Sequence, residues 1–245
     1  TRKARKGLSR ELVKYISRDK KEPEWMLLHR LKSLEEFFKM PMPNFGPDLK
    51  ELNFDEIIYY AKPGEIKPTH LWKNVPDDIK RTFEQLGIPK AERKYLAGAG
   101  AQYESQNVYH RLKEKWGKLG VIFEDMDTAL SLYPELVQQY FMKCVPMHDH
   151  KFAALHGAVW SGGTFIFIPE GINVDKPLQA YFRMNAASMG QFEHSIIKYK
   201  LLNKSTVAML AGDPLVFDEL VKLKNENINY EEIKKEIFDN FKIKR

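Results

Sequence analysis

Between residues 152 and 171 the chain reads Phe152-Ala-Ala-Leu-His-Gly-Ala-Val-Trp-Ser-Gly-Gly-Thr-Phe-Ile-Phe-Ile-Pro-Glu-Gly171. We interpret this stretch as small-residue corners separated by short apolar strands. Gly162 and Gly163 mark a corner, because glycine adopts positive φ without steric cost. Thr164 to Ile168 is a run of β-branched and aromatic residues, which favours a strand. Pro169 ends this strand, because proline cannot donate to a ladder.

The residues that follow repeat this rhythm of strand and turn. Leu178 to Met184 predicts a second strand, between turns at 173–177 and 185–190, and Gln191 to Ile197 predicts a third. Short strands at this spacing indicate an all-β stack, either a sandwich or a β-solenoid. The pattern itself does not choose between the two.

Composition and charge narrow the class of protein. The chain has 245 residues, a formal net charge of +6 and 43% hydrophobic residues, which suits one or two globular domains. No apolar run is long enough to cross a bilayer, and the basic N-terminus lacks the apolar stretch of a secretory signal. Acidic residues are interspersed with the lysines, and no aromatic-plus-basic signature accompanies them, which argues against a nucleic-acid partner.

The single cysteine, Cys144, excludes a disulfide within the chain and a zinc site built from cysteines. It favours a reducing, cytoplasmic setting. A sulfur-carrying role would need an accessible thiolate with a lowered pKa, whereas Cys144 sits between Phe141 and Val145 at a predicted helix end. We therefore predict a small, buried structural residue.

Helical spacing dominates the first 146 residues. Apolar periodicity, prolines and capping residues predict helices at 8–17, 25–40, 75–86, 107–117 and 135–143, with a cap at Asp127 or Thr128 for one more. Gly120 to Phe123 predicts a short strand. The run Ala97 to Ala101 lacks the Gly-Lys-Ser/Thr ending of a nucleotide loop, so we predict a close-packed turn there. Residues 198–245 change character, and the spacing at 215–223 and 230–241 predicts a helical tail.

The most metal-like cluster is Met147-His-Asp-His150, with His156 nearby in the sequence. Imidazole and carboxylate groups are ligands for zinc or iron. On an extended chain His148 and His150 point the same way, because side chains alternate along a strand. We keep His148 and His150 as candidate metal ligands, which in a metalloenzyme would hold stoichiometric metal. The other interpretation, which we favour, is a solvated loop before the first strand.

Many separate motifs, in order along the chain, resemble the SufB/SufD family of the SUF iron–sulfur cluster assembly system, and the SufB scaffolds within it. These motifs are Glu22-Pro-Glu-Trp-Met26, Asp55-Glu-Ile-Ile-Tyr-Tyr60, Thr82-Phe-Glu-Gln-Leu-Gly-Ile-Pro89, Leu96-Ala-Gly-Ala-Gly-Ala-Gln-Tyr103, Gly120-Val-Ile-Phe123, Tyr133-Pro-Glu-Leu136, Phe152-Ala-Ala-Leu155, Ala158-Val-Trp-Ser-Gly-Gly163, Pro177-Leu-Gln-Ala-Tyr-Phe-Arg183 and Met189-Gly-Gln-Phe-Glu193. The resemblance covers about Lys6 to Ile197. It is far more specific than any one of its motifs.

The resemblance implies a mainly helical N-terminal region (1–146) followed by the start of a right-handed parallel β-helix (147–197). With the divergent, helical C-terminal tail (198–245) that the residue pattern predicts, the expected fold class is α+β. The resemblance also implies a scaffold and not an enzyme, which receives sulfur and iron and builds a nascent, transient iron–sulfur cluster. Its implied partners are a SufC-like ATPase, a SufD-like paralogue and the sulfur carrier protein of a cysteine desulfurase. Arg183 and Asn185 stand at family positions on the proposed sulfur route, and an arginine fork suits a persulfide or sulfide anion.

The last segment departs from the family pattern. After the position of Ile197 the family continues with further β-helix coils, which hold its acceptor cysteine, and with ATPase-binding helices. Neither feature is recognisable in residues 198–245. A truncated or interrupted gene would explain why they are missing from this segment. The competing interpretation is a non-catalytic, truncated β-solenoid that acts as an interaction or structural protein, with the tail covering its cut end.

Overall fold

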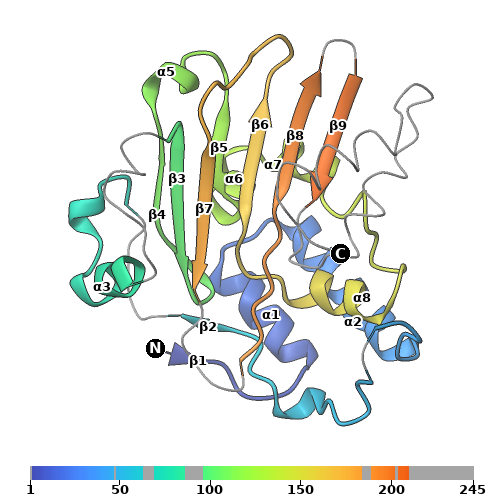
Figure 1. Ribbon diagram of the computed structural model, residues 1–245. Coiled ribbons are helices and arrows are strands. Elements are labelled where there is room, and N and C mark those ends of the chain that lie inside the picture. Colours follow the sequence, from blue (N-terminus) through green and yellow to red (C-terminus); the bar gives the residue numbers. More distant parts are fainter. Residues whose placement is uncertain are drawn as a thin grey trace.

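The computed structural model describes residues 2–46, 48–62, 69–85, 96–183, 189–201 and 204–209. Figure 1 shows two larger sheets, with helices α1, α2 and α8 gathered beyond one end of their strands. The chain combines helices with sheets that are not built as regular helix–strand alternations, so the predicted α+β class is confirmed.

The N-terminal helices match their predictions. Helix α1 (Arg10–Asp19) begins where the Ser9 hydroxyl accepts a hydrogen bond from the Leu12 amide at 3.1 Å. Helix α2 (Glu24–Lys39) follows Pro23. Their apolar faces meet helix α8 (Lys151–Val159) in a buried cluster that includes Leu12, Val13, Ile16, Leu31, Leu34, Phe37, Ala154, Leu155, Ala158 and Val159.

Helix α8 corrects the interpretation of the stretch from Phe152 onward. We expected corners and strands there, but residues 151–159 are helical, because alanine is the best helix former. Small side chains also let α8 lie close to α2: a Cβ added at Gly157 would lie 2.5 Å from Ser33 Oγ. Beyond this helix the predicted corner is confirmed, since Gly162 and Gly163 have φ of 142° and 120°.

Two larger sheets contain most of the strands. The first has the order β4-β3-β7 and is built from β3 (Gly98–Tyr103), β4 (Gln106–Leu112) and β7 (Leu178–Arg183). The second has the order β5-β6-β8-β9 and is built from β5 (Ile122–Asp125), β6 (Thr164–Ile168), β8 (Ile196–Leu201) and β9 (Lys204–Met209). A small third sheet pairs β1 (Arg2–Lys3) with β2 (Ala61–Lys62). The strands predicted near 120, 164 and 178 are therefore present. The strand predicted at 191–197 begins later than expected, at Ile196.

Consecutive strands β6, β7 and β8 alternate between the two larger sheets. Strand β7 lies parallel to β3 in one sheet, and β6 lies parallel to β8 in the other. Each sheet also contains antiparallel neighbours: β3 with β4, β5 with β6, and β8 with β9. Over the described residues the sheets are thus mixed and do not form a closed solenoid. The right-handed parallel β-helix stays a prediction.

The two larger sheets face each other across small residues of β3. A Cβ added at Gly98 would lie 2.7 Å from the Phe123 ring of the other sheet. One at Gly100 would lie 2.7 Å from the ring of His110, its neighbour on β4, which in turn packs on Phe123. The predicted turn at 97–101 is therefore wrong. Glycines occupy this strand because larger side chains would not fit between the sheets. The predicted helix at 107–117 is also wrong, since Gln106–Leu112 is strand and only α5 (Glu114–Gly117) is helical.

The remaining helices follow local signals. Helices α3 (Asp77–Gln85) and α7 (Pro134–Tyr140) lie where the sequence predicts them, and η1 (Phe54–Glu56) and η2 (Trp72–Asn74) are single 3-10 turns. Helix α6 (Met126–Leu132) is capped by Asp125, whose carboxylate accepts from the Thr128 amide at 3.0 Å, and not by Asp127 or Thr128. Across the part of the chain that the structure describes, every helix falls short of the length and apolarity of a membrane span.

The predicted helical tail is wrong at its start. Residues 198–201 and 204–209 lie in the hairpin of β8 and β9. The helices predicted at 215–223 and 230–241 lie outside the described residues.

Candidate functional site

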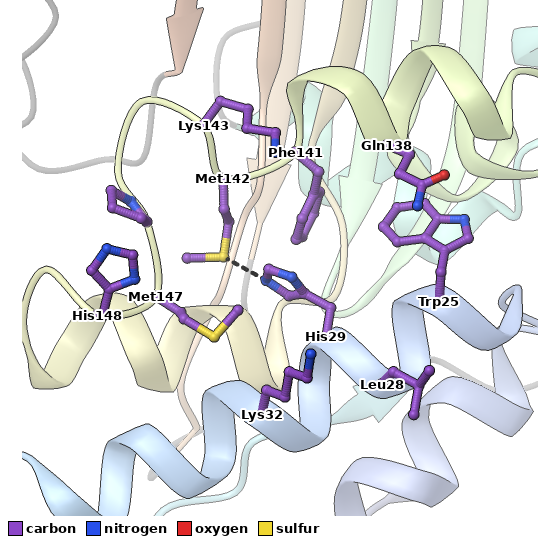
Figure 2. Close-up of a pocket in the computed structure, with 11 residues that line it drawn as sticks. Trp25, Leu28, His29, Lys32, Gln138, Phe141, Met142, Lys143, Met147 and His148 are labelled. Carbon is purple, nitrogen blue, oxygen red and sulfur yellow. Dashed lines mark hydrogen bonds between the residues drawn. The ribbon is translucent and has the colours of Figure 1, made fainter.

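An open cavity of about 590 Å³ lies between α2 and the segment that joins α7 to α8 (Figure 2), and we call it the bowl. It is lined by Trp25, Leu28, His29, Lys32, Gln138, Phe141, Met142, Lys143, Pro146, Met147 and His148. The four residues from α2 follow the spacing i, i+3, i+4, i+7, which places them on one helix face. A stripe of α2 therefore forms one wall of the bowl.

His29 lies in the floor of the bowl as a neutral imidazole. Its Nε2 is 3.2 Å from the Met142 sulfur, the contact drawn as a dashed line in Figure 2. Burial, helped by the charges of Arg30, Lys143 and Lys32, lowers the pKa of His29 from 6.5 to about 4. Near neutral pH the ring is therefore uncharged, with one of its nitrogens occupied by the thioether.

A pair of histidines, His156 and His194, lies behind the bowl. The Phe141 ring stacks on His194 at 4.2 Å between centroids, and His194 Nδ1 is 2.7 Å from His156 Nε2. Burial lowers the pKa of both histidines, that of His156 to about 4. One neutral ring thus donates to the other, and this contact joins α8 to the segment that leads into β8.

A buried ion pair fixes α2 against the end of α8. Arg30 Nε donates to Glu22 at 2.8 Å, and its Nη atoms donate to the carbonyls of Ala158 at 3.1 Å and Trp160 at 2.9 Å. The guanidinium also lies over the Trp160 ring, 4.7 Å from its centroid. Burial acts to raise the pKa of Glu22, but the charge and hydrogen bonds of Arg30 outweigh it and hold that pKa below its usual range.

The predicted metal ligands have separate structural contacts. His150 caps α8, and its Nδ1 accepts from the Ala153 amide at 3.2 Å. His148 is exposed on the edge of the bowl, and His156 pairs with His194. Among the described residues no group of three or more His, Cys, Asp and Glu side chains gathers as a metal site would require. Metal binding at His148 and His150 stays a prediction without geometric support.

Cys144 follows the bowl residue Lys143 in the chain and is half-buried. Burial raises the pKa of its thiol, so the group is protonated near neutral pH. This environment is opposite to that of a reactive thiolate.

The residues of the implied sulfur route lie in a different part of the fold. Arg183 is half-buried at the end of β7, opposite Tyr103 of β3, and its carbonyl accepts from the Glu104 amide at 2.7 Å. Asn185 lies outside the described residues. The route itself is therefore untested by this geometry.

A buried polar network near the Gly162 corner was missed by the sequence analysis. Gln102 Nε2 donates to Glu193 at 2.7 Å, and its Oε1 accepts from the Gly163 amide at 3.0 Å. Burial is the main influence on Glu193 and raises its pKa to about 8. The paired glycines were the only local signal, since a Cβ at Gly162 would overlap the Gln102 amide.

Comparisons with known proteins identify relatives of this chain. A family model described as the SufBD protein N-terminal region matches residues 99–180. The iron-sulfur cluster assembly protein SufB of Bacillus subtilis is 54% identical over 195 residues. Iron-sulfur cluster assembly SufBD family proteins of Staphylococcus saprophyticus and Staphylococcus aureus are each 55% identical over 195 residues.

These matches cover most of this chain but less than half of each relative. The aligned stretch is 80% of the chain and 42% of the relative in all three cases. The aligned length of 195 residues is consistent with the resemblance predicted for about residues 6–197. Over 80% of its length the chain is therefore similar to SufBD family proteins, and residues 99–180 match the N-terminal region of that family.

Proposed function

We propose that this chain supplies the N-terminal part of a SufB-type scaffold for iron–sulfur cluster assembly. The observation that carries the proposal is the 54% identity over 195 residues to a protein named for that process. Such a scaffold binds sulfur and iron as cargo and passes on a cluster, so it acts by holding and not by turnover. We place it in the cytoplasm, on the single half-buried cysteine and the reducing setting that it favours.

The arrangement of β6, β7 and β8 supports the start of a parallel β-helix. Successive strands β6, β7 and β8 alternate between two facing sheets. Strand β6 lies parallel to β8, and β7 lies parallel to β3, as the coils of a parallel solenoid would. In a continuing β-helix the next coil would add a parallel strand beside β8. Here the antiparallel β9 occupies that position.

The proposed partners are a SufC-like ATPase, a SufD-like paralogue and a sulfur carrier protein. Arg183 and Asn185 would face the sulfur route, where a guanidinium stabilises a persulfide or sulfide anion. The half-buried position of Arg183 supports this role, since a charge there is only partly screened by water.

The test is co-expression of the full gene product with a SufC-like ATPase and a SufD-like paralogue. We expect the three to co-purify and, after anaerobic addition of iron and a sulfide source, to show the visible absorbance of a bound cluster. An Arg183→Met variant should still co-purify with both partners. Relative to the unmodified protein, its rate of cluster accumulation should fall more with the sulfur carrier than with free sulfide. A full-length product that binds neither the ATPase nor a cluster would refute the proposal.

A further inference from the structure

The bowl has an apolar floor and an exposed polar rim. Phe141 and Met142 are buried in the floor, with Trp25 and Met147 half-buried beside them. The exposed residues of the rim come from α2, α7 and the segment after α7: Leu28, Lys32, Gln138, Lys143 and His148. Leu28 is 52% exposed although it belongs to the apolar class. A volume of about 590 Å³ is large enough for a sizeable apolar group.

The rim is cationic and has no counter-charge of its own. The eleven lining residues include two lysines and two histidines but no Asp or Glu. Within the described residues, neither Lys32 nor Lys143 forms an ion pair. Both lysines nevertheless act on His29 and help to lower its pKa, so their positive potential extends into the bowl. A binding partner would gain most by carrying negative charge around an apolar group.

The placement of polar groups fits a protein partner better than a small molecule. Small-molecule sites orient their ligands with polar groups inside the cavity. In the floor, the imidazole of His29 already contacts the Met142 sulfur at 3.2 Å. An apolar centre surrounded by polar residues is the arrangement of a protein interface hot spot. Flexible methionines such as Met142 and Met147 also adapt to differently shaped apolar anchors.

We propose that the bowl docks an acidic peptide segment of a partner protein, which inserts one large apolar side chain against Phe141 and the two methionines. Acidic residues on either side of that anchor pair with Lys32 and Lys143. This inference does not rest on the proposed role in cluster assembly, because it uses only the shape and charge of the bowl.

Selection of a random peptide display library on the purified full chain tests the proposal. The probes are the enriched peptides, prepared as fluorescein conjugates and titrated by fluorescence anisotropy. We expect enriched sequences to place Asp or Glu on both sides of a Phe, Trp or Leu. Their affinity should fall with added salt, because the rim pairs are solvent-exposed.

Charge reversal locates the binding surface. In the double variant Lys32→Glu, Lys143→Glu, two attractive rim contacts become repulsive, and we expect at least about a tenfold loss of affinity. Both side chains are exposed, so the fold should be unaffected. The matched control is Lys14→Glu, Lys73→Glu, which makes the same change in net charge at exposed positions outside the bowl. We expect the control to change affinity less than about threefold.

Three outcomes would overturn the proposal. One is a library that yields no binder. Another is a set of binders without acidic residues. The last is an equal loss of affinity in the bowl variant and in the control variant, which would reveal attraction to the net charge of the chain alone.

Discussion

Replacing Arg30 with methionine removes the cation that joins α2 to the end of α8. The change leaves the Glu22 carboxylate buried without its partner and removes the donors to the Ala158 and Trp160 carbonyls. Breaking a buried ion pair from one side costs about 3–5 kcal/mol. Since domains are stable by only about 5–15 kcal/mol, Arg30→Met should remove about a fifth or more of the free energy of unfolding.

The same variant should reverse the pH dependence that Glu22 contributes. In the native protein the folded-state pKa of Glu22 is lowered from 4.5, so its contribution is present above the unfolded pKa and is lost as pH falls through the folded one. Without Arg30, burial remains as the dominant influence and raises the folded-state pKa. Ionisation then opposes folding, and the loss of stability in Arg30→Met should be larger at pH 7 than at pH 5.

Urea unfolding followed by tryptophan fluorescence measures both effects, because Trp160 is fully buried under the Arg30 guanidinium. The control is Arg10→Met, which breaks an exposed pair with Glu35 and should cost less than about 1 kcal/mol. The double variant Arg30→Met, Glu22→Leu should recover part of the loss. If Arg30→Met is no more destabilising than Arg10→Met, or is equally so at both pH values, the reasoning is wrong.

The other predictions concern the buried histidines, the glycine corner and the cysteine. Because the pKa of His156 is lowered from 6.5 to about 4, the unfolded state binds more protons between these pH values, and about 3 kcal/mol of stability should be lost as pH falls across that range. Urea titrations of His156→Phe should show a smaller dependence of stability on pH, and an unchanged dependence would contradict this. Gly163→Ala would place a Cβ 2.0 Å from the His194 carbonyl oxygen and should lower the free energy of unfolding, measured by thermal unfolding, by about 3 kcal/mol. Gly171 also has positive φ but open space around it, so Gly171→Ala should cost only about 1 kcal/mol. Equal losses of stability would argue against close packing at the corner. Cys144 should react with iodoacetamide at pH 7.5 about tenfold more slowly than free cysteine, because burial raises its pKa, and reaction at the free rate would show an exposed thiolate.

Local signals were sufficient for several elements of the fold. Helix α1 has a serine cap and a clear apolar stripe, and α7 has proline at its first position. Strand β6 combines β-branched and aromatic residues between a glycine corner and a proline. In each case the residues within one element already favour its conformation, so tertiary contacts did not need to override it.

Other elements depend on contacts with distant residues. Strand β3 consists largely of glycine and alanine, which have low strand propensity, and it is extended because it pairs with β4 and β7 and lies against Phe123. Helix α8 was mistaken for corners and strands because its small residues fit either form, until packing on α2 is known. The bowl could not be predicted either, since α2 and the segment after α7 are more than one hundred residues apart.

The hydrogen bonds from Arg30 to the last carbonyls of α8 span 128 and 130 residues of sequence. Ribosomes add about 5–20 residues per second, so roughly 6 to 26 seconds separate the synthesis of the arginine from that of its acceptors. During this interval the apolar face of α2 has no partner from α8 and must be shielded by other means. We expect nascent chains halted before Trp160 to be bound by chaperones or cleaved by proteases more readily than chains halted beyond it.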